Sequence, residues 1–424
     1  MVTIKAFGAT DPGMKRSANH DAFSINETLK LYICCDGVSG HNGASEASST
    51  CIESIQKFLT GKAADLKKLQ DTSKPENRRQ ISELLEKSAI FASESIYKRA
   101  IKQKELAGMA TTLDALLIVN DYAFLAHVGD GRIYLLRDGQ AHQVTVDHNY
   151  ATELVLKENK STEEAQNHMY ANVLTRAVGT QAAINVDILE VELSSDDIFL
   201  LCSDGLHHYY NNQELYKAMI GTEPTQATHS MIESAKKKGG HDNLTGVVIH
   251  VTKPEEKLAG DVREKILTIQ KMDLFQFMDY PELIRILGAA RLLTYAKGET
   301  IIKEGEEGDT MFVVVNGKIS VMKGGQKISI GERGKSIGEM SLIESVPRSA
   351  TVEALEDVTV LVFSRKELFA MFRTEVQIAV KFFWSLARDM TQRLRATTEK
   401  LAEAKMEMER LEKDLPFPTE VTSS

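Results

Sequence analysis

Aspartate stands at the ends of several short apolar runs, where strands would stop. These aspartates and their neighbouring runs are Asp36 after Leu31–Cys35, Asp204 after Ile198–Cys202 and Asp242 before Leu244–Val251. Taken singly, an Asp-Gly pair after a strand is typical of a turn. Several carboxylates at strand ends also suit hard cations, because Mg²⁺ and Mn²⁺ prefer carboxylate, carbonyl and water oxygens. Two such ions about 4 Å apart can hold a bridging hydroxide that attacks phosphorus, whereas the His and Cys spacing of a zinc site is absent.

Residues 1–252 must supply the elements that position these carboxylates. Four strands are predicted around two hairpin dipeptides, in Asp114–Asp130 around Asn120-Asp121 and in Arg132–Thr145 around Asp138-Gly139. Apolar or small residues recur with helical spacing between Ile81 and Ile101. Because strands follow strands and helices lie between such blocks, we expect an α+β fold in which helices cover antiparallel sheets.

The composition excludes several classes of protein. The length of 424 residues favours two or three domains. Lys and Arg number 51 against 60 Asp and Glu, and the net charge of −9 argues against a nucleic-acid partner. The N-terminus lacks the apolar stretch of a signal peptide, and no segment offers the roughly eighteen apolar residues of a membrane span. Four Cys, with Cys34 and Cys35 adjacent, do not form a disulfide framework. We therefore expect a cytoplasmic protein that binds neither nucleic acid nor membrane.

The chain changes character after residue 252. Residues 253–273 predict a helical linker, whose apolar face would comprise Leu258, Val262, Ile266 and Ile269. Residues 274–372 then predict a small β-domain built from hairpins. Its strand-like runs are Met311–Val315, Lys318–Met322 and Gln326–Ile330, separated by Asn316-Gly317 and Gly324-Gly325.

The last zone, residues 373–415, predicts one uninterrupted helix before a tail at 416–424. Two series of residues recur every seven positions. They are Ala387, Leu394, Leu401, Met408 and Leu415, and Met390, Thr397, Ala404 and Leu411. A seven-residue repeat is typical of a coiled coil, so we expect a homodimer through this helix. The alternative is a long helix that packs on its own domain, because Thr397 and the two alanines weaken the repeat.

A series of short motifs follows one order through residues 1–252. The motifs are Asp11–Asp21, Asp36–Gly43, Met109–Thr112, His127–Asp130, Leu174–Gly179, Cys202–Gly205 and Gly240–Asn243. In this order they resemble the motifs of the type-2C metal-dependent (PPM) Ser/Thr protein phosphatases. Val38 fits the bacterial branch, because animal members have His at that position. The resemblance implies a fold of two antiparallel sheets flanked by helices, and the hydrolysis of phosphoserine or phosphothreonine on a protein substrate.

The resemblance also implies the metal ligands. Asp36, the Gly37 carbonyl group, Asp204 and Asp242 match the ligands of two core ions, Mn²⁺ or Mg²⁺. Asp130, together with Asp204, matches the ligands of a looser third ion in bacterial members.

Two further residues match groups that act on the substrate or the nucleophile. Arg16 matches the arginine that grips the substrate phosphate, and its planar fork suits two oxygens. Asp21 matches a carboxylate that orients metal-bound water. The implied mechanism is in-line attack by the bridging hydroxide, without a covalent enzyme intermediate. Residues 149–172 correspond to the family's mobile flap, which we expect to tune substrate choice; the alternative is a plain surface insertion.

The chain departs from the family pattern at four positions. His20 stands where Glu or Gln is usual, Ala110 where Gly is usual and Gly131 where Ser is common. Val38 removes the protein-borne general acid. The proton for the leaving group must then come from metal-bound water or from a nearby histidine such as His20 or His41.

The β-domain contains a second group of chemically capable residues, in Ile337–Leu342 and Pro347–Thr351. A short helix that opens after Gly338 presents free backbone N–H groups to a phosphate, and Arg348 adds a fixed positive charge. The carboxylate of Glu339 suits a ribose hydroxyl.

This group resembles the phosphate-binding cassette of the cyclic nucleotide-binding domain family, over about residues 274–372. By that match Glu339 would bind the 2′-hydroxyl, and Arg348 with the amides of Ser341 and Ser349 would bind the cyclic phosphate. Ser349 leaves cAMP and cGMP both open as the ligand. The alternative is a ligand-free structural β-domain.

Three functions fit these observations. We expect a phosphatase in signal transduction that a cyclic nucleotide regulates. A catalytically inactive, nucleotide-responsive adaptor is the alternative, and the intact carboxylates and Arg16 argue against it. A third possibility is an active phosphatase whose β-domain only docks a partner, and the intact Arg348 and Glu339 count against that.

Overall fold

The computed structural model describes residues 2–38, 43–158, 160–252, 262–344 and 346–414. The chain divides into two compact units, Met1–Glu264 and Lys265–Ser424, and each is described by itself. The division lies within one helix, α9 (Val262–Gln270), whose Val262, Ile266 and Ile269 are buried. The predicted linker residue Leu258 lies outside the described residues, and the predicted domain boundaries stay predictions.

The first unit contains two sheets of five antiparallel strands each, as the resemblance implied. One sheet has the order β1 (Thr3–Asp11), β10 (Leu244–Thr252), β9 (Asp197–Cys202), β6 (Arg132–Arg137) and β7 (Gln140–Gln143). The other has the order β2 (Asp21–Asn26), β3 (Leu31–Asp36), β4 (Leu113–Val119), β5 (Tyr122–Val128) and β8 (Asp187–Glu192). The hairpins predicted at Asn120-Asp121 and Asp138-Gly139 are confirmed.

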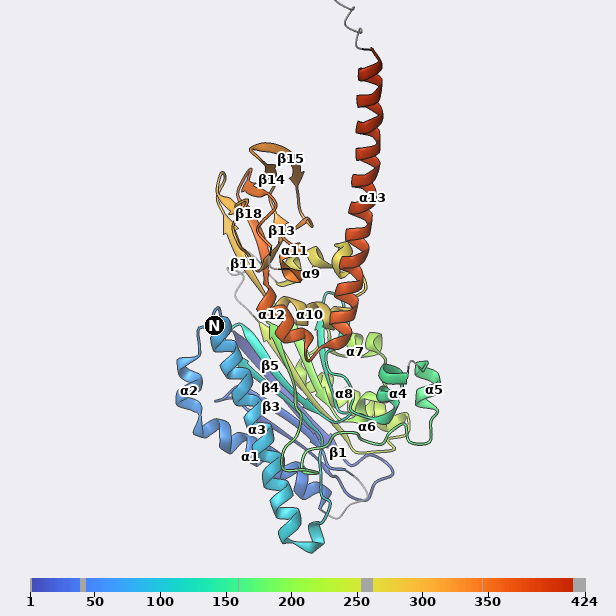
Figure 1. The fold of residues 1–424 in the computed structure, drawn as a ribbon. Helices are drawn as coiled ribbons and strands as arrows, with labels where there is room; N and C mark the ends of the chain where they lie inside the picture. The colour runs from blue at the N-terminus through green and yellow to red at the C-terminus, as the bar shows by residue number, and fades with distance from the viewer. Residues whose placement is uncertain (1, 39–42, 159, 253–261, 345, 415–424) are drawn as a thin grey trace, which may run out of the picture. The chain divides into compact units, whose positions relative to one another are not determined.

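Helices cover the outer face of each sheet, with α1 and α3 on one side of the strands and α8 on the other (Figure 1). The helices are α1 (Ala44–Gly61), α2 (Ala63–Lys68), α3 (Pro75–Lys102), α4 (Tyr150–Glu158), α5 (Thr162–Gln166), α6 (Asp204–His207), α7 (Asn212–Met219) and α8 (Pro224–Lys237). Leu117 of β4 shares a core with Ile55 of α1, and Val248 of β10 shares another with Met231 of α8. Because both faces are covered, β4 is buried along its whole length despite being antiparallel.

The second unit begins with helices and continues into two four-stranded sheets. One sheet has the order β11 (Ala290–Tyr295), β18 (Val358–Ser364), β13 (Thr310–Asn316) and β16 (Ser336–Ile337). The other has the order β12 (Thr300–Ile302), β17 (Thr351–Ala354), β14 (Ile319–Lys323) and β15 (Gln326–Gly331). The helices are α10 (Tyr280–Gly288), α11 (Met340–Ile343), α12 (Arg365–Phe372) and α13 (Val376–Asp414). The three predicted strands correspond to β13, β14 and β15.

Helix α13 spans 39 residues, and its two halves differ in burial. In the first half Ile378, Phe382 and Leu386 are buried, whereas Trp384 is 66% exposed. Beyond them, members of the seven-residue repeat are open to solvent, with exposures of 67% at Leu394, 69% at Leu401, 61% at Met408 and 59% at Leu411. None of the helices in the described ranges combines the length and the apolar character that a bilayer crossing demands.

Candidate active site and candidate nucleotide site

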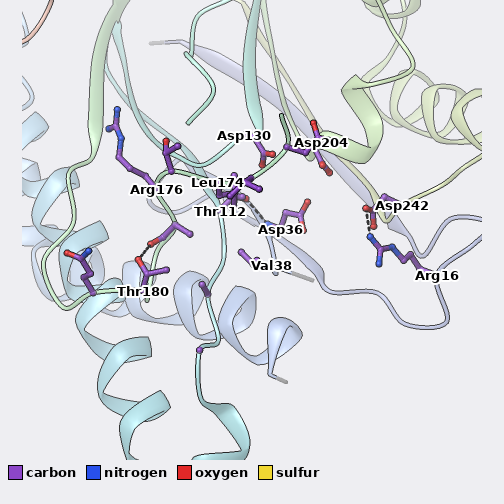
Figure 2. A pocket seen from close by; sticks show the side chains of 17 residues that line it. Arg16, Asp36, Val38, Thr112, Asp130, Leu174, Arg176, Thr180, Asp204 and Asp242 are labelled. Carbon is purple, nitrogen blue, oxygen red and sulfur yellow. Dashed lines mark hydrogen bonds and ion pairs between the residues drawn. The ribbon is translucent and has the colours of Figure 1, made fainter. Parts of the chain in front are cut away.

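Four carboxylates and Arg16, from distant parts of the first unit, line a single cavity of about 610 Å³ (Figure 2). Asp36 ends β3, Asp130 follows β5, Asp204 begins α6 after β9, and Asp242 precedes β10. Arg16 comes from the loop after β1. The strands therefore bring together the aspartates that the sequence placed at strand ends.

Close backbone approaches hold the loops around this cavity. Gly13 has φ +77°, and a Cβ there would lie 2.2 Å from the Asp242 carbonyl oxygen. A Cβ on Gly205 would lie 2.1 Å from the Asn243 carbonyl oxygen. Only glycine fits these two contacts, which bring the Arg16 loop and the start of α6 against the start of β10.

Strand pairing places Asp21 beside Asp36. The two residues are directly opposite in the β2–β3 ladder. The Asp36 backbone N–H donates to Thr112 Oγ1 (2.9 Å), and the Thr112 N–H donates back to the Asp36 carbonyl oxygen (2.8 Å). Asp21 is buried, and its Oδ2 accepts a hydrogen bond from Thr245 Oγ1 (2.6 Å). Thr112 also lines the cavity and belongs to a quoted motif, although the sequence assigned it no role.

The crowded carboxylates raise one another's pKa values. Burial raises the pKa of Asp36 well above its usual range, and the charges of Asp21 and Asp204 raise it further. Burial also raises the pKa of Asp130 to about 8 and that of Asp21 to about 6. Such groups favour a site where positive charge replaces the protons.

The residues present fit divalent cations with water as additional ligand. Among the described residues, Asp21 Oδ1 and Asp204 Oδ1 are buried without a hydrogen-bond partner. Within the same residues, no three His, Cys, Asp or Glu side chains form a compact cluster suited to a metal ion. The carboxylates instead surround a cavity with room for ions that keep several of their waters, as Mg²⁺ prefers.

Arg16 reaches into the same cavity. Its Nη2 lies 2.7 Å from Asp242 Oδ2, and Figure 2 shows the two side chains directed toward each other. The hydrogen bond to Asp242 raises the pKa of Arg16, so the guanidinium stays charged. Arg16 and Asp242 thus lie together at one end of the cavity.

The other end of the cavity was not predicted as part of the site. Residues 172–177 form a wall there, with Thr180 and Gln181 beside it. Figure 2 shows Arg176 and Thr180 on the side away from Asp204 and Asp242. Arg176 belongs to a quoted motif that could have indicated its place, whereas no local pattern marks Thr180 or Gln181.

Two of the four departures from the family pattern have a visible consequence. Val38 lines the cavity, and no histidine is among the described residues that do so. His20 does not line the cavity, and its carbonyl oxygen accepts a hydrogen bond from the Gly37 N–H (3.2 Å). His41 lies outside the described residues. A Cβ on Gly131 would lie 2.1 Å from Asp114 Oδ2, so a serine there would require Asp114 to move.

The second unit brings together most of the predicted nucleotide-binding residues. Arg348 is buried, and its Nη1 donates to Ser341 Oγ and to the Thr310 carbonyl oxygen (2.8 Å each). A Cβ on Gly338, where φ is +75°, would lie 2.5 Å from Arg348 Nη1. Burial lowers the pKa of Arg348, and among the described residues no carboxylate lies within ion-pair distance of it. Ser349 is exposed.

Glu339 is buried and forms an ion pair with an arginine of α13. Its carboxylate pairs with Arg393 of helix α13, which also lies 3.3 Å from Ser336 Oγ and 2.8 Å from Asp389 Oδ2. The side chain of Glu339 is 10% exposed, against 39% for Arg393. No local pattern indicates this pair, because its two members lie 54 positions apart.

Comparisons with known proteins agree with both motif matches. The Protein phosphatase 2C family profile matches residues 14–244, and the Cyclic nucleotide-binding domain profile matches residues 292–375. The chain is 30% identical over 244 residues to the serine/threonine phosphatase stp of Listeria innocua, covering 57% of this chain and 93% of that protein. It is 29% identical over 250 residues to the protein phosphatase PhpP of Streptococcus pneumoniae, covering 58% and 97%.

Solved structures resemble the same part of the chain. The serine/threonine phosphatase PstP/Ppp of Mycobacterium tuberculosis superposes with a TM-score of 0.52 at 28% identity, covering 60% of this chain and 100% of that one. The catalytic domain of PstP in complex with 2 manganese ions superposes with a TM-score of 0.51 at 27% identity, with the same coverages.

Proposed function

The chain belongs to the protein phosphatase 2C family and is a protein-serine/threonine phosphatase, and on that premise we propose that it hydrolyses phosphoproteins with divalent cations and is regulated by a cyclic nucleotide. The observation that supports the catalytic half is the convergence of Asp36, Asp130, Asp204, Asp242 and Arg16 on one cavity. Burial raises the pKa values of Asp36, Asp130 and Asp204, and bound cations would lower them again.

We assign the core cations to Asp36, the Gly37 carbonyl group, Asp204 and Asp242, and a third cation to Asp130 with Asp204. When bound, Mn²⁺ or Mg²⁺ ions supply an activated water nucleophile and positive charge for the phosphoryl oxygens.

The protein side chains then have separate tasks. Arg16 binds two non-bridging oxygens of the phosphate, for which it must exchange its bond to Asp242 for bonds to the substrate. Asp21 stays anchored by Thr245 through Oδ2 and leaves Oδ1 free to orient water. Because Val38 offers no proton, the serine or threonine leaving group takes its proton from water in the cavity.

For the nucleotide, we assign the cyclic phosphate to Arg348 with the Ser341 and Ser349 amides at the Gly338 turn, and the ribose to Glu339. Arg348 supports this assignment, because a buried guanidinium bonded only to neutral groups favours an anion.

Regulation would pass through helix α13. The ribose of a bound nucleotide and Arg393 compete for the same carboxylate of Glu339, so nucleotide binding would release the middle of α13 from the β-domain. The nucleotide would thus change the position of α13 relative to the β-domain of the same unit. Both cAMP and cGMP fit the assigned groups.

We propose a second copy of this chain as the partner of α13. Its exposed leucines and methionines at seven-residue spacing form an apolar stripe that a parallel coiled coil would cover. In the double variant Leu394→Asp, Leu401→Asp, light scattering should report a monomer. A dimer of unchanged mass would show that these positions are not the interface.

We place the protein in the cytoplasm, without nucleic acid or membrane as partner. All four cysteines are free and buried, which suits a reducing compartment.

The first experiment is phosphopeptide hydrolysis by the full chain in Mn²⁺, with and without chelator, each with cAMP, cGMP or no nucleotide. Metal-dependent release that one nucleotide changes severalfold is the expected result. Metal-dependent release that neither nucleotide changes would reduce the β-domain to a docking or dimerisation module. No release under any condition would favour the inactive adaptor.

A further inference from the structure

The backbone of His148 joins two parts of the active-site wall. Its N–H donates to the Gly129 carbonyl oxygen (2.7 Å), and its carbonyl oxygen accepts from the Thr175 N–H (2.8 Å). Gly129 directly precedes Asp130, and Thr175 lines the cavity beside Arg176. One residue therefore connects the turn that presents Asp130 with the segment that forms the far wall.

The imidazole ring of His148 repeats this connection. Its Nδ1 accepts a hydrogen bond from the Gly129 N–H (3.1 Å), so the proton must reside on Nε2. Nε2 then donates to Asp187 Oδ2 (3.1 Å), while Asp187 Oδ1 accepts from Arg176 Nη1 (2.5 Å). Both ring nitrogens therefore form hydrogen bonds, Nδ1 to the Asp130 turn and Nε2 to Asp187, which pairs with Arg176.

We propose that His148 and Asp187 are positioning residues, which hold the Arg176 wall at a fixed separation from the Asp130 turn. A phosphorylated side chain can then reach the cations while the peptide beside it contacts the wall. Neither residue lines the cavity, so both act through their neighbours. The inference rests on the proposed function, because it assumes that the cavity takes a phosphopeptide.

The surroundings of the ring favour a fixed position. The His127 ring lies 4.6 Å from that of His148 and is itself held by Asp114 (2.7 Å) and the Val146 carbonyl oxygen (3.0 Å). The turn at Gly129, with φ +115°, lies outside the strands, so hydrogen bonds determine its place. Small displacements of such supporting groups cost substantial activity where two groups must meet the substrate together.

Two amide substitutions separate the two halves of the connection. Asn at position 148 keeps an acceptor near the place of Nδ1 and loses the donor to Asp187, whereas Gln keeps a donor near the place of Nε2 and loses the acceptor for Gly129. We expect His148→Asn and Asp187→Ala each to raise the KM for a phosphothreonine peptide by about five- to tenfold. The kcat/KM for p-nitrophenyl phosphate, which is too small to need the wall, should change by less than about twofold.

His148→Gln should have the opposite pattern. Its peptide KM should stay near that of the native protein, while calorimetric titration with Mn²⁺ should show the weakest metal site weakened about threefold or more. The double variant His148→Asn, Asp187→Ala should be no worse than the worse single variant, because both remove one connection. His229→Asn is the matched control, since that histidine is exposed on α8, where its ring lies beside Phe7 and its Nδ1 contacts the Thr225 carbonyl oxygen, and it does not line the cavity.

Two results would overturn the inference. One is an unchanged peptide KM in folded His148→Asn and Asp187→Ala. The other is an equal loss on both substrates that follows the fall in melting temperature, which would show a merely structural role. Absence of Mn²⁺-dependent hydrolysis by the native protein would overturn the proposed function instead, and the Mn²⁺ titration of His148→Gln would still test the contact to Gly129.

Discussion

The two candidate sites differ in whether their charged side chains are bonded to other groups of the protein. In the phosphatase cavity, carboxylates crowd together, and buried Asp21 Oδ1 and Asp204 Oδ1 have no partner among the described residues. Burial raises the pKa values of Asp36 and Asp204. In the nucleotide site, Glu339 is paired with Arg393, and Arg348 is bonded to Thr310 and Ser341. The first site gathers carboxylates whose raised pKa values bound cations would lower. The second is occupied by the protein's own groups, which a ligand must displace.

Removing one of the crowded carboxylates should have the largest effect on activity. Asp36→Asn removes a carboxylate that we assign to both core cations, so we expect kcat on a phosphopeptide to fall by about a thousandfold or more at any Mn²⁺ concentration. Steady-state kinetics across a Mn²⁺ titration would measure it. Activity that excess Mn²⁺ restores would contradict the shared-ligand assignment.

Substitution of Arg16 tests whether this side chain binds the substrate phosphate. We expect Arg16→Ala to lower kcat/KM by about 10- to 100-fold, mostly through KM, because a bidentate contact to phosphate is lost. Arg16→Lys should recover part of the loss, since it keeps the charge but not the fork. Unchanged kinetics in Arg16→Ala would remove Arg16 from the phosphate site.

Removing Arg393, which pairs with Glu339 in the nucleotide site, should raise the affinity for nucleotide. Arg393→Ala should tighten cyclic nucleotide binding by about three- to tenfold, because Glu339 is freed from its competitor. Fluorescence anisotropy with a labelled nucleotide would measure the affinity. Arg395→Ala, an exposed arginine on the same helix, is the control. Weaker binding in Arg393→Ala would mean that Arg393 supports Glu339 in the bound state.

Arg348→Ala completes that test. It should abolish nucleotide binding and leave hydrolysis without nucleotide unchanged, because Arg348 belongs to the second unit and not to the catalytic cavity.

The smallest effect concerns stability and pH. Asp130 and Asp21 have folded pKa values of about 8 and about 6, above the ordinary carboxylate value of about 4. Between the ordinary carboxylate pKa and these folded values, the folded state binds more protons than the unfolded state. The free energy of unfolding therefore falls as pH rises through this range. Without metal, the melting temperature should therefore drop by a few degrees between about pH 5.5 and pH 8. Asp130→Asn should flatten that slope, and Mn²⁺ should stabilise the native protein more at the higher pH. A slope that Asp130→Asn leaves unchanged would exclude Asp130 as its source.

Local patterns predicted most of the fold. Hairpin dipeptides gave β4 to β7, and aspartates at the ends of apolar runs gave the carboxylate end of the cavity, because strand ends gather at sheet edges. The motif order supplied the identity of these groups, which periodicity alone does not.

Contacts between distant segments were beyond local patterns. His148 meets Gly129 across 19 positions and Asp187 across 39, and Arg393 meets Glu339 across 54. Such pairs depend on how helices and loops pack on the sheets, and no residue spacing encodes that. The wall at Thr180 and Gln181 was missed for the same reason.

Trp384 is the only tryptophan of the chain, and it stands 66% exposed on α13. Excitation at the red edge of protein absorbance would therefore make one side chain emit, with the whole phosphatase unit silent. Its emission maximum and its quenching by acrylamide would follow α13, the helix whose Arg393 pairs with Glu339 of the nucleotide site. The native protein thus contains its own optical probe, and a titration with cAMP or cGMP could be followed without a label or an introduced mutation.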